Sequence, residues 1–492
     1  MKRKLSLVVA SLTVLALIMT SCAGNKTKSK ETSQKKEPVK IVWGGWENKL
    51  MALELIERFN KENPDIKVEF FSNGQWLGNE QMSKLVASNQ MPDIINLENP
   101  VVPVQNDWVI DLKPYLDKDT GSKKLYNNFV KYGTVNNKVI MLPEKIYLWG
   151  LFVNKDLLSS YNIPVPGYDW TVDDYVNILK KTTKKGVSIG TNGVNEIMKH
   201  LPPQMNDSLG WGSFNEAKKE YELGDEWKYA ANVAADLYKS NVSLYEHEDA
   251  LGVPSNYPEG SKEQKDVNAK REKFMEDTVG EKTDYDAWLK GKAATWMDFS
   301  WSLGFDKNAG FGGFDWDYYP FPTKDKGDKS RPGLVVDSLA ITTKCKNPDA
   351  AFRFLKYLTY DVKGFDDRYD IVKNYNKDKL KEKYKGVLDD TFFNEPLNFG
   401  NIPAINDQAV ISKWLELNNT KPGVAYMIGN MGTGYVDGFK VTPGFDEAYH
   451  KTIEKTVVEQ VYTGKKTPED LAQELQDKAN EITKKAFDAL NK

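Results

Sequence analysis

The chain has 492 residues and a formal net charge of −3, and tryptophan, tyrosine and phenylalanine make up 12% of it. A chain of this length exceeds the roughly 250–300 residues that one hydrophobic core usually serves, so we expect two lobes. The near-neutral charge argues against a nucleic-acid partner. Cysteine occurs twice, as Cys22 and Cys345, which excludes a cysteine-rich zinc pattern.

Residues 1–21 have the pattern of a secretory signal peptide. Lys2, Arg3 and Lys4 precede an uncharged apolar run, 5–19, which is shorter than the roughly 20 residues of a membrane span. The following Met-Thr-Ser-Cys resembles a bacterial lipobox, which implies that Cys22 carries lipid (palmitate-type) chains and becomes the mature first residue. Two or more chains suffice for stable membrane anchoring. The alternative is a plain signal peptide with an incidental cysteine.

Residues 22–38 then form a predicted tether. The stretch is polar, rich in lysine and without apolar periodicity. A flexible chain of this length reaches roughly 20–25 Å. Two roles fit the lysines, contact with an anionic membrane surface or solubility alone.

The next sixty residues alternate strands and helices. Residues 39–43 form a short β-rich run, and Ala52, Leu55, Ile56 and Phe59 mark one face of a helix. A strand is predicted at 66–71, a helix around 82–86 and a strand at 94–97. Strand, helix, strand, helix, strand with short links predicts a parallel sheet with right-handed crossovers.

Three loops follow these three strands, and in such sheets ligands bind where the strands end. The loops carry aromatic rings, carboxylates and amides, and glycines that let backbone approach a ligand. An aromatic plate beside fixed hydrogen-bonding groups suits a pyranose, whose C–H face packs on the ring. The core of the lobe is the alternative place for Trp43 and Trp46. The candidate ligand contacts here are Trp43, Trp46, Glu47, Trp76, Glu98 and Asn99.

A hairpin is predicted around Asn136-Asn137, and a series of motifs spans the mature chain from Phe59 to Pro468. Together with the lipobox, they resemble the extracellular solute-binding proteins of ABC importers, in the sugar-binding group that includes maltose-binding protein. The motifs are Phe59-Asn-Lys-Glu-Asn-Pro64, Met91-Pro-Asp-Ile-Ile95, Leu142-Pro143 to Asn154-Lys-Asp-Leu157, Gly291-Lys-Ala-Ala294, Phe314-Asp-Trp-Asp-Tyr-Tyr-Pro-Phe-Pro322, Leu339-Ala-Ile341 with Lys346-Asn-Pro-Asp-Ala-Ala351, and Tyr462-Thr-Gly-Lys-Lys-Thr-Pro468.

The resemblance implies an α/β, two-lobed fold of the periplasmic-binding-protein type. Each lobe would be a doubly wound, mostly parallel sheet flanked by helices, with the ligand cleft between the lobes. Because the chain crosses between lobes more than once, lobe 1 is expected at 38–152 plus 320–373 and lobe 2 at 153–319 plus 374–492. Lobes joined in this way close on their ligand.

By the same resemblance, lobe 2 supplies the facing wall of the cleft, and a strand that crosses back to lobe 1 carries Asp337. Trp301 takes the position of a frequent sugar-stacking aromatic, although Phe299 stands where the family usually has glycine. Asp298 has two interpretations, a hydroxyl acceptor or a helix N-cap. Asp337 interrupts an apolar strand, which is costly unless the carboxylate is paired, and we expect a ligand or Arg331 as its partner. The candidate contacts are Tyr147, Trp211, Trp296, Asp298, Trp301 and Asp337.

Two stretches depart from compact members of the family, 240–285 and 361–400, and a long glycine-rich loop, 423–445, precedes the last helices. Loops of this length are usually functional or mobile. They either extend the groove or decorate the far surface, and the sequence leaves both interpretations open.

An enzyme is the strongest alternative class. Glu47, Glu98, Glu144 and Asp298 would have to include a pair of carboxyl groups at a catalytic separation. Gly186–Gly190 spells G-x-S-x-G, but Ser188 lies in a strand-like run rather than on a sharp turn. Asp117–Gly121 begins like a calcium loop and lacks its later ligands, so we interpret it as a turn. No cofactor and no metal are expected.

The sequence therefore predicts a lipid-anchored, monomeric binding protein on the outer face of the cytoplasmic membrane. It would capture an oligosaccharide and hand it to an ABC permease, whose ATPase powers uptake. The alternative ligand is a polyamine, peptide or amino acid, since a cation would also suit acids beside aromatic rings.

Overall fold

The computed structural model describes residues 37–45, 47–71, 79–97, 99–303, 313–394, 397, 399–418 and 421–490. From Pro38 onward the chain forms one compact unit. The predicted signal peptide, Cys22 and nearly all of the tether lie outside the described residues. Among the helices that are described, none is both long enough and apolar enough to cross a membrane.

One sheet organises this unit. Its strands are β1 (Val39–Gly44), β2 (Ile66–Phe71), β3 (Ile94–Leu97), β6 (Leu142–Asn154), β9 (Thr295–Phe299), β10 (Trp316–Tyr319), β11 (Gly333–Ile341) and β12 (Tyr435–Val436). The order is β10-β6-β11-β3-β1-β2, with β12 beside β11 and β9 beside β6. Two small hairpins stand apart, β4 (Thr134–Val135) with β5 (Lys138–Val139), and β7 (Phe214–Asn215) with β8 (Glu220–Tyr221).

The α/β class and the parallel order of the first three strands are confirmed. β1 pairs in parallel with β2 and β3, and Trp43 lies beside Phe70 and Ile94. The crossovers are α1 (Lys49–Glu62) and α2 (Asn79–Ala87). The predicted apolar face of α1 is buried at all four positions. Beyond this parallel part, β11 runs antiparallel to β3 and β6, and β6 runs antiparallel to β9 and β10.

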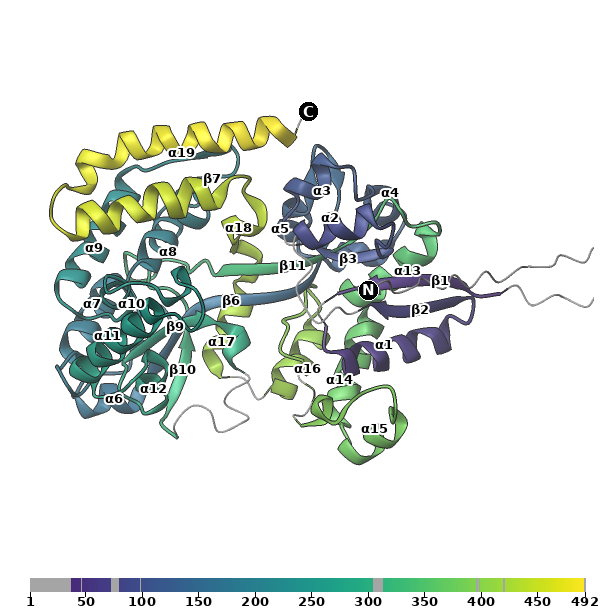
Figure 1. Ribbon diagram of the computed structural model, residues 1–492, viewed down its shortest axis with the longest axis horizontal. Coiled ribbons are helices and arrows are strands. Elements are labelled where there is room, and N and C mark those ends of the chain that lie inside the picture. The colour runs from purple at the N-terminus through teal and green to yellow at the C-terminus, as the bar shows by residue number, and fades with distance from the viewer. Residues whose placement is uncertain are drawn as a thin grey trace, which may run out of the picture. The chain divides into compact units, whose positions relative to one another are not determined.

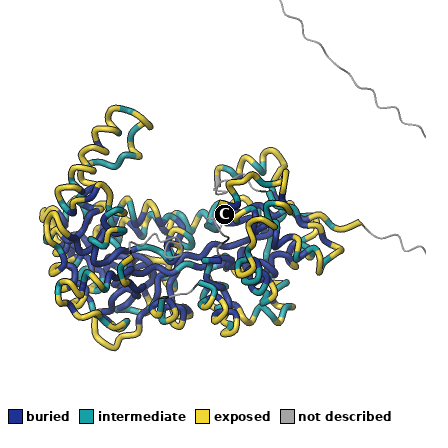
Figure 2. Tube along the Cα trace, turned by 90° about the horizontal axis from the view of Figure 1, so that it is seen from below, coloured by how far each residue is buried: buried dark blue, intermediate teal, exposed yellow. Residues whose placement is uncertain are grey.

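β6 and β11 are the long strands that join the two ends of the sheet. Figure 1 shows them side by side across the middle of the molecule, with β1, β2 and β3 at one end and β9 and β10 at the other. In β6, Ile146 and Leu148 belong to one hydrophobic core while Trp149 and Leu151 belong to another, because alternate side chains point to opposite faces. Both strands lie in the buried interior that Figure 2 shows in dark blue. All nine residues of β11 are buried, and Tyr147 is the single incompletely buried residue of β6.

Helices cover both faces of the sheet. The α-helices that follow α2 are α3 (Val101–Gln105), α4 (Lys113–Leu116), α5 (Asn127–Tyr132), α6 (Lys155–Ser160), α7 (Val172–Thr182), α8 (Glu196–Met205), α9 (Asp225–Lys239), α10 (Tyr245–Asp249), α11 (Lys262–Val279), α12 (Asp284–Leu289), α13 (Pro348–Thr359), α14 (Val362–Lys373), α15 (Lys377–Lys383), α16 (Gln408–Asn418), α17 (Pro422–Gly429), α18 (Gly438–Val441) and α19 (Pro468–Leu490). Shorter 3-10 segments are η1 (Thr120–Lys124), η2 (Trp211–Ser213), η3 (Pro254–Asn256), η5 (Asp390–Phe393) and η6 (Met431–Thr433), and two π-helical segments, η7 (Asp446–Glu454) and η8 (Val457–Tyr462), precede α19.

The segment that contains α15 and α16 packs against α1 and α14. Lys383 and Tyr384 both donate to Glu54 of α1, the tyrosine at 2.6 Å. Lys413 of α16 pairs with Asp366 of α14 at 2.5 Å. Periodicity identifies such helices but not the surface they cover. The predicted lobe limits, including the boundary at residue 374, stay predictions.

Candidate functional site

A cluster of buried and half-buried polar side chains, most of them charged, lies at β6 and β11 beside the ends of β1 and β3. We call it the polar network, and its members are Glu47, Asn96, Glu144, Lys145, Asp337, Arg368 and Lys440. Lys145 Nζ lies 3.3 Å from the Glu47 carboxylate, and Asn96 Nδ2 donates to Glu144 at 3.2 Å. Arg368 of α14 lies 3.7 Å from Glu144 on the other side. Each described acid in the network therefore has a cationic neighbour.

Burial and pairing set the charge states in this network. Burial raises the pKa of Glu47, but Lys145 and Arg368 outweigh it and hold the pKa below its usual range. Glu144 behaves oppositely, since burial and the neighbouring Glu47 together raise its pKa despite Lys145. Burial alone would lower the pKa of Lys145, whereas Glu47 and Glu144 raise it overall. Lys145 therefore carries a positive charge, and the acidic side chains of the polar network lie around it.

Asp337 has a different partner from the one we expected. Its carboxylate is 2% exposed and accepts from Lys440 Nζ of α18 at 2.8 Å. The prediction of Arg331 as partner is wrong, because that guanidinium donates to the carbonyl oxygens of Pro203 and Leu209 instead. A buried carboxylate needs a counter-charge, and Lys440 supplies it.

Two predicted contacts, Tyr147 and Trp301, come together at the edge of the network. Their rings meet edge to face with centroids 5.3 Å apart, and Trp301 also lies 4.0 Å from the ring of Phe299. We call these three side chains the aromatic edge. The Tyr147 hydroxyl donates to Asn401 Oδ1 at 2.9 Å. Trp301 is 47% exposed, so one large face of its indole is open to a ligand.

Asp298 organises the residues around Trp301. Its carboxylate accepts from Ser302 Oγ at 2.5 Å and from the Phe299 amide at 2.7 Å. Burial raises the pKa of Asp298, while those two bonds and the indole groups of Trp296 and Trp301 act in the opposite direction. The carboxylate therefore fixes the start of the turn after β9, and with it the position of the exposed indole.

Three other predicted contacts are packed in the interior. Trp43 is 0% exposed, with Phe70 and Phe354 at centroid distances of 4.8 and 5.5 Å. Trp211 packs against His200 at 4.4 Å. Trp296 is 7% exposed. Trp43 lies one residue before the end of β1 and packs on Phe354 of α13, so the core interpretation describes it, and its ring offers no open face to a ligand.

Four predicted contacts remain, and the structure describes one of them, Asn99. Trp46, Trp76 and Glu98 lie outside the described residues. Asn99 is half-buried, and its Oδ1 accepts from the Val101 amide at 3.1 Å at the start of α3. It also lines a shallow pocket together with Phe439 and Lys451.

His200 extends the buried polar groups into α8. Its Nδ1 lies 2.8 Å from the Tyr435 hydroxyl and its Nε2 lies 3.3 Å from the Glu196 carboxylate. Burial lowers the pKa of His200 to about 4, although Glu196 opposes the shift. Burial raises the pKa of Glu196, but Lys199 and His200 bring it down to about 2. The imidazole is therefore neutral at physiological pH beside an ionised carboxylate.

Sequence reasoning missed Lys440 and Arg368. Arg368 lies on the buried face of α14 with Phe365 and Ile371, and a charge on an apolar helical stripe is a usable signal. No comparable pattern marks Lys440, which lies in the glycine-rich segment 423–445.

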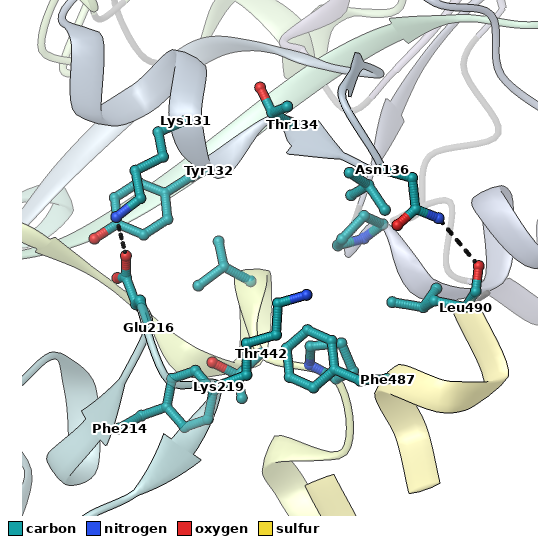
Figure 3. A pocket seen from close by; sticks show the side chains of 14 residues that line it. Lys131, Tyr132, Thr134, Asn136, Phe214, Glu216, Lys219, Thr442, Phe487 and Leu490 are labelled. Carbon is teal, nitrogen blue, oxygen red and sulfur yellow. Dashed lines mark hydrogen bonds and ion pairs between the residues drawn. The ribbon is translucent and has the colours of Figure 1, made fainter. Parts of the chain in front are cut away.

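A separate cavity of about 280 Å³ lies where α5 and the β4–β5 hairpin meet the β7–β8 hairpin and the end of α19 (Figure 3). Lys131 pairs with Glu216 across it at 2.9 Å, and Asn136 Nδ2 donates to the Leu490 carbonyl at 3.3 Å. None of the predicted site residues lines this cavity.

Two motifs weighed in the sequence, the G-x-S-x-G run and the calcium-like loop, have structural roles. Ser188 is buried and donates to the Thr182 carbonyl at 2.7 Å, so it is not on an exposed elbow. Asp119 caps η1 through the Gly121 amide and pairs with Lys356 at 2.7 Å, in line with the predicted turn. Within the described ranges, no group of three or more His, Cys, Asp or Glu residues is arranged to hold a metal ion.

Comparison with known proteins supplies an independent view. The family model described as "bacterial extracellular solute-binding protein" matches residues 51–361. The multiple sugar-binding protein of Streptococcus mutans is 24% identical over 363 residues, which cover 71% of this chain and 79% of that protein.

Two solved structures share the fold across nearly the whole chain. An ABC substrate-binding protein of Listeria monocytogenes, in complex with cycloalternan, has a TM-score of 0.59 and 17% identity, covering 90% of this chain and 98% of that one. The sugar-binding protein MalE of Xanthomonas citri has a TM-score of 0.60 and 14% identity, covering 91% and 98%.

Proposed function

The chain belongs to the family of bacterial extracellular solute-binding proteins, and from this premise we propose that it captures an oligosaccharide in the cleft between its lobes. The family consists of solute-binding proteins. The Streptococcus mutans relative is named a multiple sugar-binding protein, and the Listeria monocytogenes structure is a complex with cycloalternan. In this proposal the chain closes on the sugar and delivers it to an ABC permease, with no chemistry of its own.

The observation that carries the proposal is the open indole of Trp301 beside Tyr147. A pyranose packs its C–H face on such a ring and needs donors and acceptors for its hydroxyls within reach. Tyr147 provides a phenolic group, and Glu47 and Asn99 follow the ends of β1 and β3. Trp46, Trp76 and Glu98, from the same strand-end loops, complete the proposed set.

The polar network favours a neutral sugar over a polyamine. A cationic ligand needs carboxylates that are not already neutralised. In the part of the chain that the structure describes, Glu47, Glu144 and Asp337 each lie within 4 Å of a lysine or arginine. The network is thus close to neutral, which suits hydroxyl groups better than an ammonium group.

Delivery to a permease and anchoring through Cys22 belong to the same proposal. The lipobox-like Met-Thr-Ser-Cys would hold the protein, as a monomer, on the outer face of the cytoplasmic membrane. Labelling of cells with a radioactive or alkyne fatty acid tests this part. Label on the wild-type chain and none on Cys22→Ser is expected, and equal labelling of both would contradict the anchor.

A thermal-shift panel tests the ligand class. The mature chain is heated with oligosaccharides, amino acids and polyamines in parallel. A ligand at one hundred times its Kd stabilises the folded state by about 2.7 kcal/mol, which raises the unfolding midpoint by several degrees. We expect the shift with an oligosaccharide. A shift with a polyamine and none with any sugar would replace the proposal by its alternative.

The loop after β1, within residues 43–49, gives a residue-level test. Trp46→Ala is expected to weaken sugar binding about tenfold, or about 1.4 kcal/mol, and to leave the unfolding midpoint unchanged. Isothermal titration with the sugar identified in the panel measures the difference. An unchanged Kd would indicate that Trp46 does not contact the sugar.

A further inference from the structure

The aromatic residues around Asp298 extend beyond Trp301. Among the described residues, the exposed large aromatic side chains are Tyr245, Tyr285, Trp301 and Phe439, at 37, 38, 47 and 38%. Single exposed hydrophobic residues are normal on a protein surface. Three of these four, however, lie around β9 and the turn that follows it, and that grouping needs an explanation.

Tyr245 and Tyr285 come from the 240–285 segment, whose role the sequence left open. Both rings contact Trp296, at centroid distances of 6.3 and 6.1 Å, so Trp296 lies between them. Burial raises the pKa of both phenols, and the charge of Asp298, two residues further along β9, raises both further, with Asp284 the larger charge beside Tyr245. The Trp301 indole N–H donates to the Asp298 carboxylate. The segment therefore adds its tyrosines to the wall that already carries the aromatic edge.

The Tyr245 ring is held in place rather than left to move. A Cβ at Gly193 would lie 3.0 Å from Tyr245 Cδ2, so the ring rests directly on that glycine. Asn192 Nδ2 donates to the Tyr245 hydroxyl at 3.0 Å, and Asn192 is itself 0% exposed and bonded to Met297 of β9. A ring fixed before binding loses little conformational entropy when a ligand stacks on it.

We infer that Tyr245 and Tyr285 form an additional sugar subsite next to Trp301, which makes the chain select an oligosaccharide longer than the aromatic edge alone would hold. This inference rests on the proposed function. Each stacked ring adds apolar contact with one more sugar unit, and the hydroxyls of the two tyrosines can pair with the sugar hydroxyls. The 240–285 segment thereby sets the length of the ligand.

Native mass spectrometry with a mixed pool of di- to heptasaccharides tests the subsite. The full mature chain is compared with Tyr285→Ala and Tyr245→Ala, and Tyr369→Ala on α14 serves as the matched control. We expect the two variants to bind the longest glycans about threefold to tenfold more weakly and the shortest ones unchanged, so that the bound population shifts to shorter chains. Tyr369→Ala should keep the wild-type distribution. Tyr285 needs no Gly193 contact, so it carries the test if Tyr245→Ala fails to fold.

The outcomes separate the subsite from the proposed function. If wild type binds glycans and the variants keep its length preference, the subsite is wrong and the function stands. An equal loss for all lengths also overturns the subsite, because it indicates a distorted main site. If wild type binds no glycan in the pool, the proposed function fails and the subsite fails with it.

Discussion

The polar network and the aromatic edge lie two residues apart on β6, at Lys145 and Tyr147, and they differ in what they leave open. Lys145 is 5% exposed and faces Glu47, Glu144 and Asp337. Trp301, which packs on Tyr147, is 47% exposed. The charges of the polar network pair with one another, whereas the aromatic edge leaves a ring face open to a ligand. Stability and ligand affinity should therefore respond to different residues, even at neighbouring positions.

The largest effect is expected on the stability side. Lys145→Met leaves Glu47, Glu144 and Asp337 without a central cation in a buried site. Removing one partner of a buried charge cluster costs about 3–5 kcal/mol of unfolding free energy. Urea unfolding followed by tryptophan fluorescence measures this change. Lys485→Met is the control, since its exposed pair with Glu481 on α19 should be worth less than about 0.5 kcal/mol. Equal losses in both variants would break the comparison.

A second effect concerns pH. His200 has a folded-state pKa of about 4 against 6.5 for the free side chain. As pH falls from 6.5 to 4, His200 becomes protonated in the unfolded chain but not in the folded chain. The free energy of unfolding therefore falls across this window. At pH 5 the loss is about 2 kcal/mol. Glu196 contributes lower down, between about 4.5 and 2.

Urea unfolding at pH 7.5 and pH 5 checks this slope. His200→Gln keeps a polar side chain beside Tyr435 and removes the titrating group. The variant should lose clearly less stability than wild type between the two pH values. A wild-type slope that persists in His200→Gln would assign the effect to other groups.

A third prediction moves to the aromatic edge. Trp301→Ala should weaken sugar binding at least about tenfold, or about 1.4 kcal/mol. Because nearly half of the indole is already in solvent, unfolding free energy should change by less than about 1 kcal/mol. Isothermal titration and urea unfolding give the two numbers. Trp301→Phe keeps a stacking face and should fall between wild type and alanine. A variant that loses stability and keeps its affinity would reverse the comparison.

The smallest effect is expected at the cavity of Figure 3. The Lys131 side chain is 68% exposed where it pairs with Glu216. Exposed pairs contribute about 0–1 kcal/mol. Lys131→Met should therefore change the unfolding midpoint by only a degree or two in a thermal melt. A loss comparable with that of Lys145→Met would show that this surface holds the two hairpins together more firmly than its exposure implies.

Local patterns in the sequence were enough for the first three strands and their helices. The apolar face of α1 and the alternation of β2 depend on neighbours a few residues away. The hairpin at Asn136-Asn137 was also predictable, because asparagine tolerates positive φ. In the structure the two residues have φ of 50° and 64°. These features need no knowledge of distant parts of the chain.

The site was less predictable, because its pairings are long-range. Asp337 binds Lys440 rather than the nearby Arg331, and no periodicity connects those two segments. Trp43 and Trp301 are the same residue type beside a strand end, yet one is covered by Phe354 and the other is open. Which helix covers which tryptophan depends on tertiary packing. The sequence identified the aromatic candidates and could not rank their exposure.

The position of β11 has a consequence for how the chain is made. Leu97 of β3 pairs with Ser338, and Trp149 of β6 pairs with Gly333, so two early strands share a neighbour that is synthesised much later. Until residues 333–341 emerge, β3 and β6 present unpaired edges, and such edges invite pairing with other chains. Pairings of this range also form slowly. The sheet of this chain therefore cannot be completed before residues 333–341 have been synthesised.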